Sequence, residues 1–417
     1  MLRRKQSTKL RTRQKRRRWT LIMLVILFAL FVPAVLAFLD VFQIGGEATA
    51  EIFGVAVTAL GAIFVVFELQ DNERVTCCDM MASMNFQFIE NKRLMMLYQE
   101  LEDCYRNPDK ELKITDEWDE KQLHTSDMMA YFTFYEVLYE YIKHGITDIK
   151  QMDDLFGDRF FKLIHNPFVQ ERELYPVPSS YANIFELYGA WWEHRVSSVA
   201  DEKRLMAMKQ NAIPEIYWKK KLYLKESAYI DIVPRKITLV HKEKGTKDFE
   251  LRRLFPRYLK EVMNLQKHIS EKLDVPKVFA LSSEEEFLES MLIDYCYGLF
   301  DGGRIVAQSV SVLNRESYRN LGQTCLRERA VEYVTFDTIQ VHEEYRGYGI
   351  QKFFIQEAER LAQLVEANYI LATVSPENVP SLRNFEESGF KSIRTQKMPG
   401  ELYGNAMREL VCKQVRG

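Results

Sequence analysis

The chain has 417 residues, of which 47% are hydrophobic and 28% charged, and its net charge at pH 7 is −2. This length accommodates two globular domains with additional segments, and the ordinary composition excludes a low-complexity or fibrous protein. The charge is unevenly distributed, because residues 1–18 carry ten Lys and Arg side chains and no acid, which leaves −12 for the remainder.

Two apolar segments follow this basic tail. Residues 19–39 are uncharged and close to the ~20 residues that a membrane-spanning helix needs, and residues 52–69 form a second apolar run. Small residues recur in the second run at Gly54, Thr58 and Ala62, a spacing that favours close helix packing. We therefore expect a transmembrane helical hairpin over residues 19–69. A cleaved secretory signal is disfavoured, because its apolar region usually has only ~7 to ~15 residues.

The expected topology follows from the distribution of Lys and Arg. Residues 40–51, between the two apolar segments, contain neither, whereas the tail is rich in both. By the positive-inside rule the sequence predicts a two-pass membrane protein with both termini in the cytoplasm. The basic tail would then contact anionic lipids of the inner leaflet, and we do not expect it to bind nucleic acid.

Residues 70–225 have helical periodicity and many aromatic side chains, among them Trp191 and Trp192. Aromatic residues at this density are typical of a packed core. We predict an all-α domain of unknown role. The six cysteines show no CxxC spacing, so we expect free thiols and no metal site.

The most informative stretch lies in the C-terminal third of the chain. Alternating apolar and polar residues predict a strand over residues 332–341, and apolar residues at helical spacing begin at Ile350. The turn between these elements reads Arg346-Gly347-Tyr348-Gly349. The unpaired N–H groups at a helix start attract anions, glycines let a phosphate approach the backbone, and an arginine adds positive charge. This stretch therefore predicts a phosphate-binding turn.

A further strand is expected over residues 368–374, and the next helix begins near Asn378 and ends at Gly389. In the order of its elements and in these motifs, the segment 231–417 resembles the GNAT-type N-acetyltransferases. The resemblance implies an α/β GNAT fold, with a mixed, splayed central sheet flanked by helices. The expected order of elements is β-α-α-β-β-β-α-β-α-β.

The resemblance also implies that acetyl-CoA is the co-substrate and that no metal is needed. The residues expected to bind acetyl-CoA are Ile339, Val341, Arg346, Gly347, Tyr348, Gly349, Ile350, Gln351, Asn378, Ser381 and Phe385. The sequence departs from the family pattern at two positions. If the family's turn motif begins at Arg346, Gln351 stands where the family has Gly or Ala; if it begins at Glu344, both glycines match and Glu344 is the departure. Phe385 stands where many relatives have a Tyr that protonates the departing thiolate.

The general base is expected among the acids of the strand over residues 332–341. Glu332 and Asp337 are five residues apart, so in a regular strand they face opposite sides unless a bulge intervenes. Tyr403 and water are the candidate proton donors in place of the missing Tyr. His342 is expected at the surface near the turn.

Two functions agree with these residues. The first is a membrane-anchored N-acetyltransferase that transfers an acetyl group from acetyl-CoA to an amine of unknown identity on the cytoplasmic side. The second is a catalytically silent acyl-CoA-binding module with a GNAT fold. The glycine turn is expected in both. The Phe at position 385 favours the second, but relatives without that Tyr can still be active, so the enzyme is the preferred interpretation.

Overall fold

A computed structural model describes residues 46–199, 206, 208–224, 233–273, 280–313, 333–397 and 407–415. The chain divides into two compact units, Met1–Met84 and Asn85–Gly417. The basic tail, the first apolar segment at residues 19–39, Glu332 and Tyr403 all lie outside the described residues.

The second apolar segment belongs to one long helix, α2 (Gly46–Glu90). Phe64 and Leu69 in this segment are each 57% exposed. Among the residues that the structure describes, no helix has the length and apolarity to cross a membrane. The prediction of a two-pass membrane protein with both termini in the cytoplasm is therefore wrong. Residues 52–69 are not a separate helix, because α2 continues through the polar stretch Gln70-Asp71-Asn72-Glu73-Arg74.

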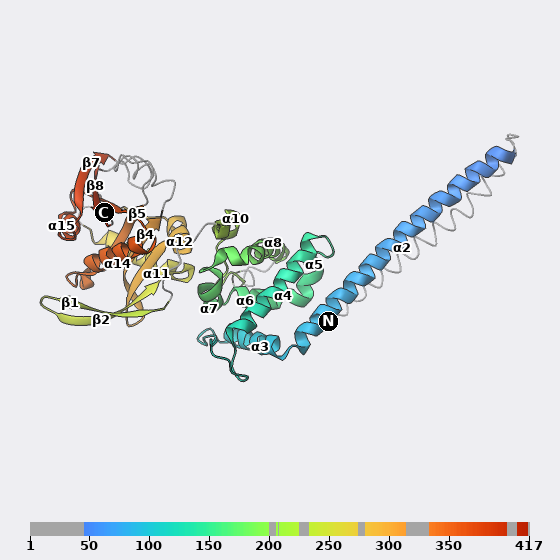
Figure 1. The fold of residues 1–417 in the computed structure, drawn as a ribbon, viewed down its shortest axis with the longest axis horizontal. Helices are drawn as coiled ribbons and strands as arrows, with labels where there is room; N and C mark the ends of the chain where they lie inside the picture. Colours follow the sequence, from blue (N-terminus) through green and yellow to red (C-terminus); the bar gives the residue numbers. More distant parts are fainter. Residues whose placement is uncertain are drawn as a thin grey trace. The chain divides into compact units, whose positions relative to one another are not determined.

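The helical part of the second unit follows α2, and its central helices are coloured cyan to green in Figure 1. Its elements are α3 (Lys92–Arg106), α4 (Thr125–Lys143), α5 (Ile149–Met152), η1 (Asp153–Gly157), α6 (Asp158–Ile164), α7 (Pro167–Val169), η2 (Gln170–Leu174), η3 (Pro178–Tyr181), α8 (Ala182–Ser198), α10 (Glu215–Lys219) and η4 (Leu222–Leu224). The predicted aromatic core is confirmed, because Trp191 is fully buried and Trp192 is 4% exposed. Trp191 stacks on Phe160, with 5.0 Å between the ring centroids.

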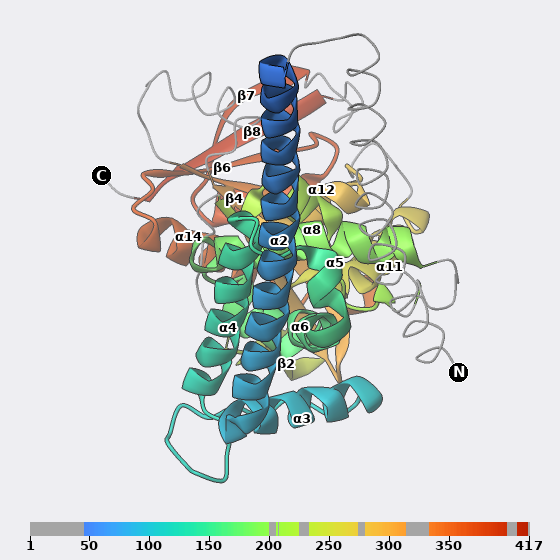
Figure 2. The ribbon, with the colours of Figure 1, turned by 90° about the vertical axis from the view of Figure 1, so that its right-hand side faces the viewer.

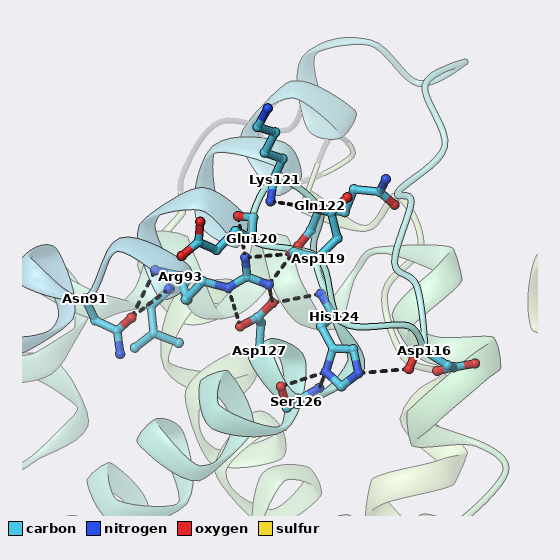
Figure 3. Close-up of polar contacts among 11 residues, drawn as sticks. Asn91, Arg93, Asp116, Asp119, Glu120, Lys121, Gln122, His124, Ser126 and Asp127 are labelled. Carbon is cyan, nitrogen blue, oxygen red and sulfur yellow. Dashed lines mark hydrogen bonds and ion pairs between the residues drawn. The ribbon is translucent and has the colours of Figure 1, made fainter.

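A partly buried ion pair between Arg93 and Asp127 links the start of α3 to the start of α4. The Arg93 Nε donates to Asp127 at 2.9 Å, and its other nitrogens donate to the backbone carbonyls of Glu120 at 3.0 Å and Gln122 at 2.7 Å (Figure 3). Burial acts to raise the pKa of Asp127, but the hydrogen bonds from Arg93 and from the His124 N–H hold that pKa below its usual value. These hydrogen bonds attach the loop that precedes α4 to the start of α3.

The C-terminal part contains an eight-stranded sheet in the order β1-β2-β3-β4-β5-β6-β8-β7. The strands are β1 (Arg235–His241), β2 (Gly245–Arg253), β3 (Tyr295–Asp301), β4 (Arg304–Leu313), β5 (Tyr333–Val341), β6 (Tyr369–Val374), β7 (Lys391–Lys397) and β8 (Met407–Gln414). Strands β6, β8 and β7 lie side by side in Figure 2. All neighbouring strands are antiparallel except β5 and β6, which are parallel.

Helices cover both faces of this sheet. Val262 of α11 (Leu259–Glu271) and Phe287 of α12 (Glu284–Ile293) belong to a core on one face. Phe354 of α14 (Ile350–Leu364) belongs to the core on the other face. Two short 3-10 turns, η5 (Pro256–Tyr258) and η7 (Glu343–Tyr345), and the helix α15 (Val379–Glu387) complete the described elements. The expected mixed sheet flanked by helices is thus confirmed, but the expected order has six strands and the sheet has eight, the additional strands being β2 and β8.

Candidate active site

The sheet opens between its two parallel strands. β5 pairs with β6 only from Tyr333↔Tyr369 to Phe336↔Ala372. Beyond this point β6 continues beside β8, whereas β5 continues beside β4. The last residues of β5 therefore present one backbone edge to a gap instead of to a neighbouring strand.

A β-bulge marks the start of this gap. Val310 pairs with Thr338 and Ser311 with Phe336, so Asp337 is the extra residue of β5. The Thr338 hydroxyl donates to the Asp337 carboxylate at 3.0 Å, which places these two side chains together. The bulge changes the alternation of the strand, as bulges do.

The glycine turn connects the open end of β5 to α14. Gly349 directly precedes α14 and has φ +75°, and a Cβ added there would meet nothing within 4 Å. No side chain caps the first N–H groups of α14. Gly347 has φ +88°, and a Cβ there would lie 2.5 Å from the His241 ring. The turn therefore needs glycine at both positions and leaves the backbone at the helix start accessible to an anion.

A cavity of about 800 Å³ lies along this turn and the open part of β5. Of the residues predicted to bind coenzyme, it is lined by Ile339, Val341, Arg346, Gly347, Gly349, Ile350, Gln351, Asn378 and Ser381. Tyr348 does not line it, because its ring is 8% exposed and packs against Phe249 at 5.8 Å. The spatial arrangement thus gathers residues from a strand, a turn and two helices around one cavity.

Three cationic side chains line the same cavity: Lys242, Arg346 and Lys352. Lys352 forms an ion pair with Glu387. Lys242 and Arg346 are exposed and form no ion pair with any residue inside the described ranges. Positive side chains next to a helix N-terminus suit a ligand that carries several phosphates.

Hydrogen bonds tie α14 to α15 at the far side of this cavity. The Gln351 amide donates to the Ser381 hydroxyl at 2.8 Å and accepts from the Asn384 amide at 2.8 Å. Asn378 caps α15 by accepting from the Ser381 N–H at 3.2 Å. Gln351, which departs from the family pattern, therefore has a structural role here.

A smaller cavity of about 110 Å³ adjoins the larger one, because Ile339, Asn378 and Ser381 line both. Asp337 and Phe385 line only the smaller cavity. Phe385 is 2% exposed, and its ring lies 5.8 Å from Phe336. Glu332 and Tyr403, which lie outside the described residues, remain predictions.

Arg408 and Ser282 are among the residues of the smaller cavity that were not predicted from the sequence. Arg408 of β8 is 5% exposed and lines it. Ser282, before α12, also lines it and is held by Gln266 of α11, whose amide bonds both to the Ser282 carbonyl at 2.8 Å and to its N–H at 2.9 Å. No local motif marks either residue, since the cavity joins segments more than 50 residues apart in the sequence.

His342 is buried at 4% exposure, so its predicted surface position is wrong. Its ring stacks on His268, with 4.5 Å between centroids, and possible ligand atoms of both rings and Glu343 lie within 4.8 Å of one another. Arg304 approaches His342 Nε2 at 3.0 Å. The Glu344 N–H approaches Nδ1 of the same ring at 3.4 Å, so both ring nitrogens of His342 face a hydrogen-bond donor. Burial lowers the pKa of His342, and the positive charge of Arg304 acts in the same direction.

These features define the class of the domain, an α/β fold whose ligand cavity opens between two parallel strands above a glycine turn. Residues 261–390 match the model of the Acetyltransferase (GNAT) family. Residues 261–390 are therefore a GNAT acetyltransferase domain, which supports an acyltransferase activity. Among curated proteins, none matches this sequence.

Solved structures of acetyltransferases are similar to about two fifths of the chain. A GNAT-family acetyltransferase from Streptococcus pneumoniae is 18% identical, with a TM-score of 0.30, and the match covers 39% of this chain and 97% of that one. The putative acetyltransferase yncA from Salmonella typhimurium, solved with acetyl-CoA, is 11% identical, with a TM-score of 0.32 and coverages of 41% and 96%. The polyamine N-acetyltransferase of Drosophila melanogaster is 13% identical, with a TM-score of 0.33 and coverages of 40% and 100%. Similarity at this level transfers neither substrate nor mechanism.

Proposed function

We propose that the protein is an acetyl-CoA-dependent N-acetyltransferase that acts on a primary amine. The observation that carries the proposal is the pair of adjoining cavities where β5 and β6 separate, one beside the glycine turn and one beside Asp337. The first is lined by the glycine turn and by positive side chains, which suit phosphates, and the second is lined by the Asp337 carboxylate, the proposed proton acceptor. An N-acetyltransferase needs both.

The coenzyme would lie in the larger cavity. Its pyrophosphate fits the N–H groups at the start of α14, where Gly349 leaves open space and Arg346 adds a positive charge. The pantetheine arm would extend between the open edge of β5 and α15, along Ile339 and Asn378, toward the smaller cavity. The backbone edge of β5 from Ile339 to Val341 is the proposed donor to the thioester carbonyl oxygen.

Asp337 is the proposed general base among the described residues. It would take one proton from the acceptor ammonium, after which the amine nitrogen bonds to the carbonyl carbon and the carbon–sulfur bond breaks. The second proton of the nitrogen passes through solvent to the thiolate, because the phenyl ring of Phe385 cannot supply a proton. Glu332 and Tyr403 remain proposed as an alternative base and an alternative proton donor.

A catalytically silent acyl-CoA-binding module is the second candidate, and Phe385 is the observation that favours it. Both candidates bind acyl-CoA, but only the enzyme releases free thiol from acetyl-CoA when an amine is present. Release of thiol that depends on Asp337 would exclude the silent module.

The first test is calorimetric titration of acetyl-CoA into the full chain and into Gly349→Val. A branched side chain at φ +75° strains the turn and projects into the cavity, so we expect micromolar binding by the unmodified protein and none by the variant. Gly145→Val is the matched control, because Gly145 has φ +70° and open space but lies outside both cavities. Equal binding by all three proteins would contradict the proposed coenzyme site.

A further inference from the structure

The hairpin formed by β1 and β2 lies against the glycine turn. The two strands are at one edge of the sheet (Figure 1), and the turn that connects them runs from His241 to Gly245. Residues 235–253, which form the hairpin, precede the segment 261–390 that matches the family model. The hairpin is therefore a feature of this chain that the family match does not cover.

Hydrogen bonds and a ring contact fix the tip of this hairpin. Nδ1 of His241 accepts from the N–H groups of Glu243 at 3.0 Å and of Lys244 at 3.1 Å. The Lys244 ammonium donates to the Glu344 carbonyl at 3.3 Å. The His241 ring lies 5.0 Å from the Tyr348 ring. The tip is thus attached to residues before and within the glycine turn.

The tip of the hairpin brings Lys242 to the larger cavity. The described residues that line this cavity include four charged side chains, Lys242, Arg346, Lys352 and Glu377. Lys352 is paired with Glu387. Lys242 and Arg346 are exposed and have no ion-pair partner among the residues that the structure describes. Within the described lining, these two cations therefore remain for an anionic ligand.

Acetyl-CoA has a third phosphate besides its pyrophosphate. Under the proposed function, the pyrophosphate lies at the start of α14 beside Arg346. The third phosphate is a monoester on the 3′ position of the ribose, and it carries about −1.5 to −2 charges at pH 7. Lys242 is the cation of the described lining that is left for it. A lysine ammonium suits this role because it binds phosphate as a compact point charge with three donors.

We propose that Lys242 binds the ribose 3′-phosphate of coenzyme A, so that the β1–β2 hairpin selects the 3′-phosphorylated coenzyme over acyl donors that lack this group. This inference rests on the proposed acetyltransferase function. The ammonium donates charge-assisted hydrogen bonds to the phosphate oxygens, and the attachment of the hairpin keeps Lys242 beside the cavity. A donor such as 3′-dephospho-acetyl-CoA retains the pyrophosphate and the pantetheine arm but lacks this pair.

The test compares two donors that differ only in this phosphate. Calorimetric titration of the full chain gives Kd for acetyl-CoA and for 3′-dephospho-acetyl-CoA. The readout is the ratio of Kd for the dephospho donor to Kd for acetyl-CoA. A substitution that only perturbs the fold weakens the binding of both donors and leaves the ratio unchanged, whereas loss of the contact with the phosphate lowers the ratio.

We expect a ratio of about 5 to 10 for the unmodified protein, because the pair is charge-assisted but exposed to solvent. Lys242→Gln should reduce the ratio to about 2 or less, and Lys242→Arg should retain most of it, since the positive charge is kept. Added salt should lower the ratio of the unmodified protein by screening the pair. Lys236→Gln is the matched control, because Lys236 is also an exposed lysine near β1's start but lies outside the cavity lining, and it should leave the ratio unchanged.

The results distinguish this inference from the proposed function. Equal affinity of the unmodified protein for the two donors, or an unchanged ratio in Lys242→Gln, would overturn the inference and leave the coenzyme site at the glycine turn in place. If the full chain binds neither donor, the proposed function fails together with the inference.

Discussion

The loop that lines the smaller cavity depends on one glutamine. Gln266 is 4% exposed, and its amide nitrogen donates to the Ser282 carbonyl at 2.8 Å. Its amide oxygen accepts from the Ser282 N–H at 2.9 Å and from the Gln340 side chain at 3.0 Å. Gln266 therefore ties the segment before α12 to strand β5, and Gln266→Met, nearly equal in size and without polar amide atoms, tests this role.

The expected loss of stability depends on whether Ser282 and Gln340 can find new hydrogen-bond partners after the substitution. Ser282 is half-buried, so its two backbone groups can turn to water, and we count about 0.5 to 1 kcal/mol for each bond lost. Gln340 is 1% exposed and keeps a buried amide without this acceptor, which costs about 1 to 3 kcal/mol. The free energy of unfolding should therefore fall by about 3 kcal/mol.

Two measurements check this expectation. Urea denaturation gives the change in the free energy of unfolding, and hydrogen exchange gives the protection of the Ser282 N–H. We expect that protection to fall at least about 30-fold, which corresponds to about 2 kcal/mol. Lys267→Met is the control, because the Lys267 side chain is 75% exposed, and its change should stay within about 0.5 kcal/mol. If Ser282 remains equally protected and Gln266→Met is as stable as the unmodified chain, the reasoning is refuted.

Two further predictions concern catalysis and pH. Asp337→Asn should reduce kcat by about 10²- to 10⁴-fold with little change in acetyl-CoA affinity by calorimetry, whereas Asp248→Asn, which also removes a carboxylate bonded to a threonine hydroxyl, should have no effect on rate. Burial lowers the pKa of His165 to about 3, so its ring is neutral in the folded protein and becomes protonated on unfolding below about pH 6.5. The free energy of unfolding should therefore decrease as the pH is lowered, by about 2 kcal/mol between pH 8 and pH 5. Urea denaturation followed by tryptophan fluorescence measures this loss, and an equal loss in His165→Gln would show that another group is responsible.

The sequence by itself determined the features that depend on neighbouring residues. A strand, a turn with two glycines and an amphipathic helix are local patterns, and the structure forms β5, the turn and α14 in that order. The helix after Asn378 and the buried aromatic residues around Trp191 follow in the same way from short-range periodicity. Periodicity did not reveal β2, because charged residues alternate along it and only Phe249 and Leu251 mark its inner face as apolar.

Other features were decided only by the tertiary structure. Which side of β5 presents Asp337 depends on a bulge that is visible only in the pairing with β4. Arg408 enters the site because β8 lies beside β6, although 71 positions separate it from Asp337. The apolar run at residues 52–69 suggested a membrane span, but in the structure it is one part of a 45-residue helix. The conformation of the glycine turn is thus local, whereas the polar lining of the smaller cavity arises from contacts between distant strands.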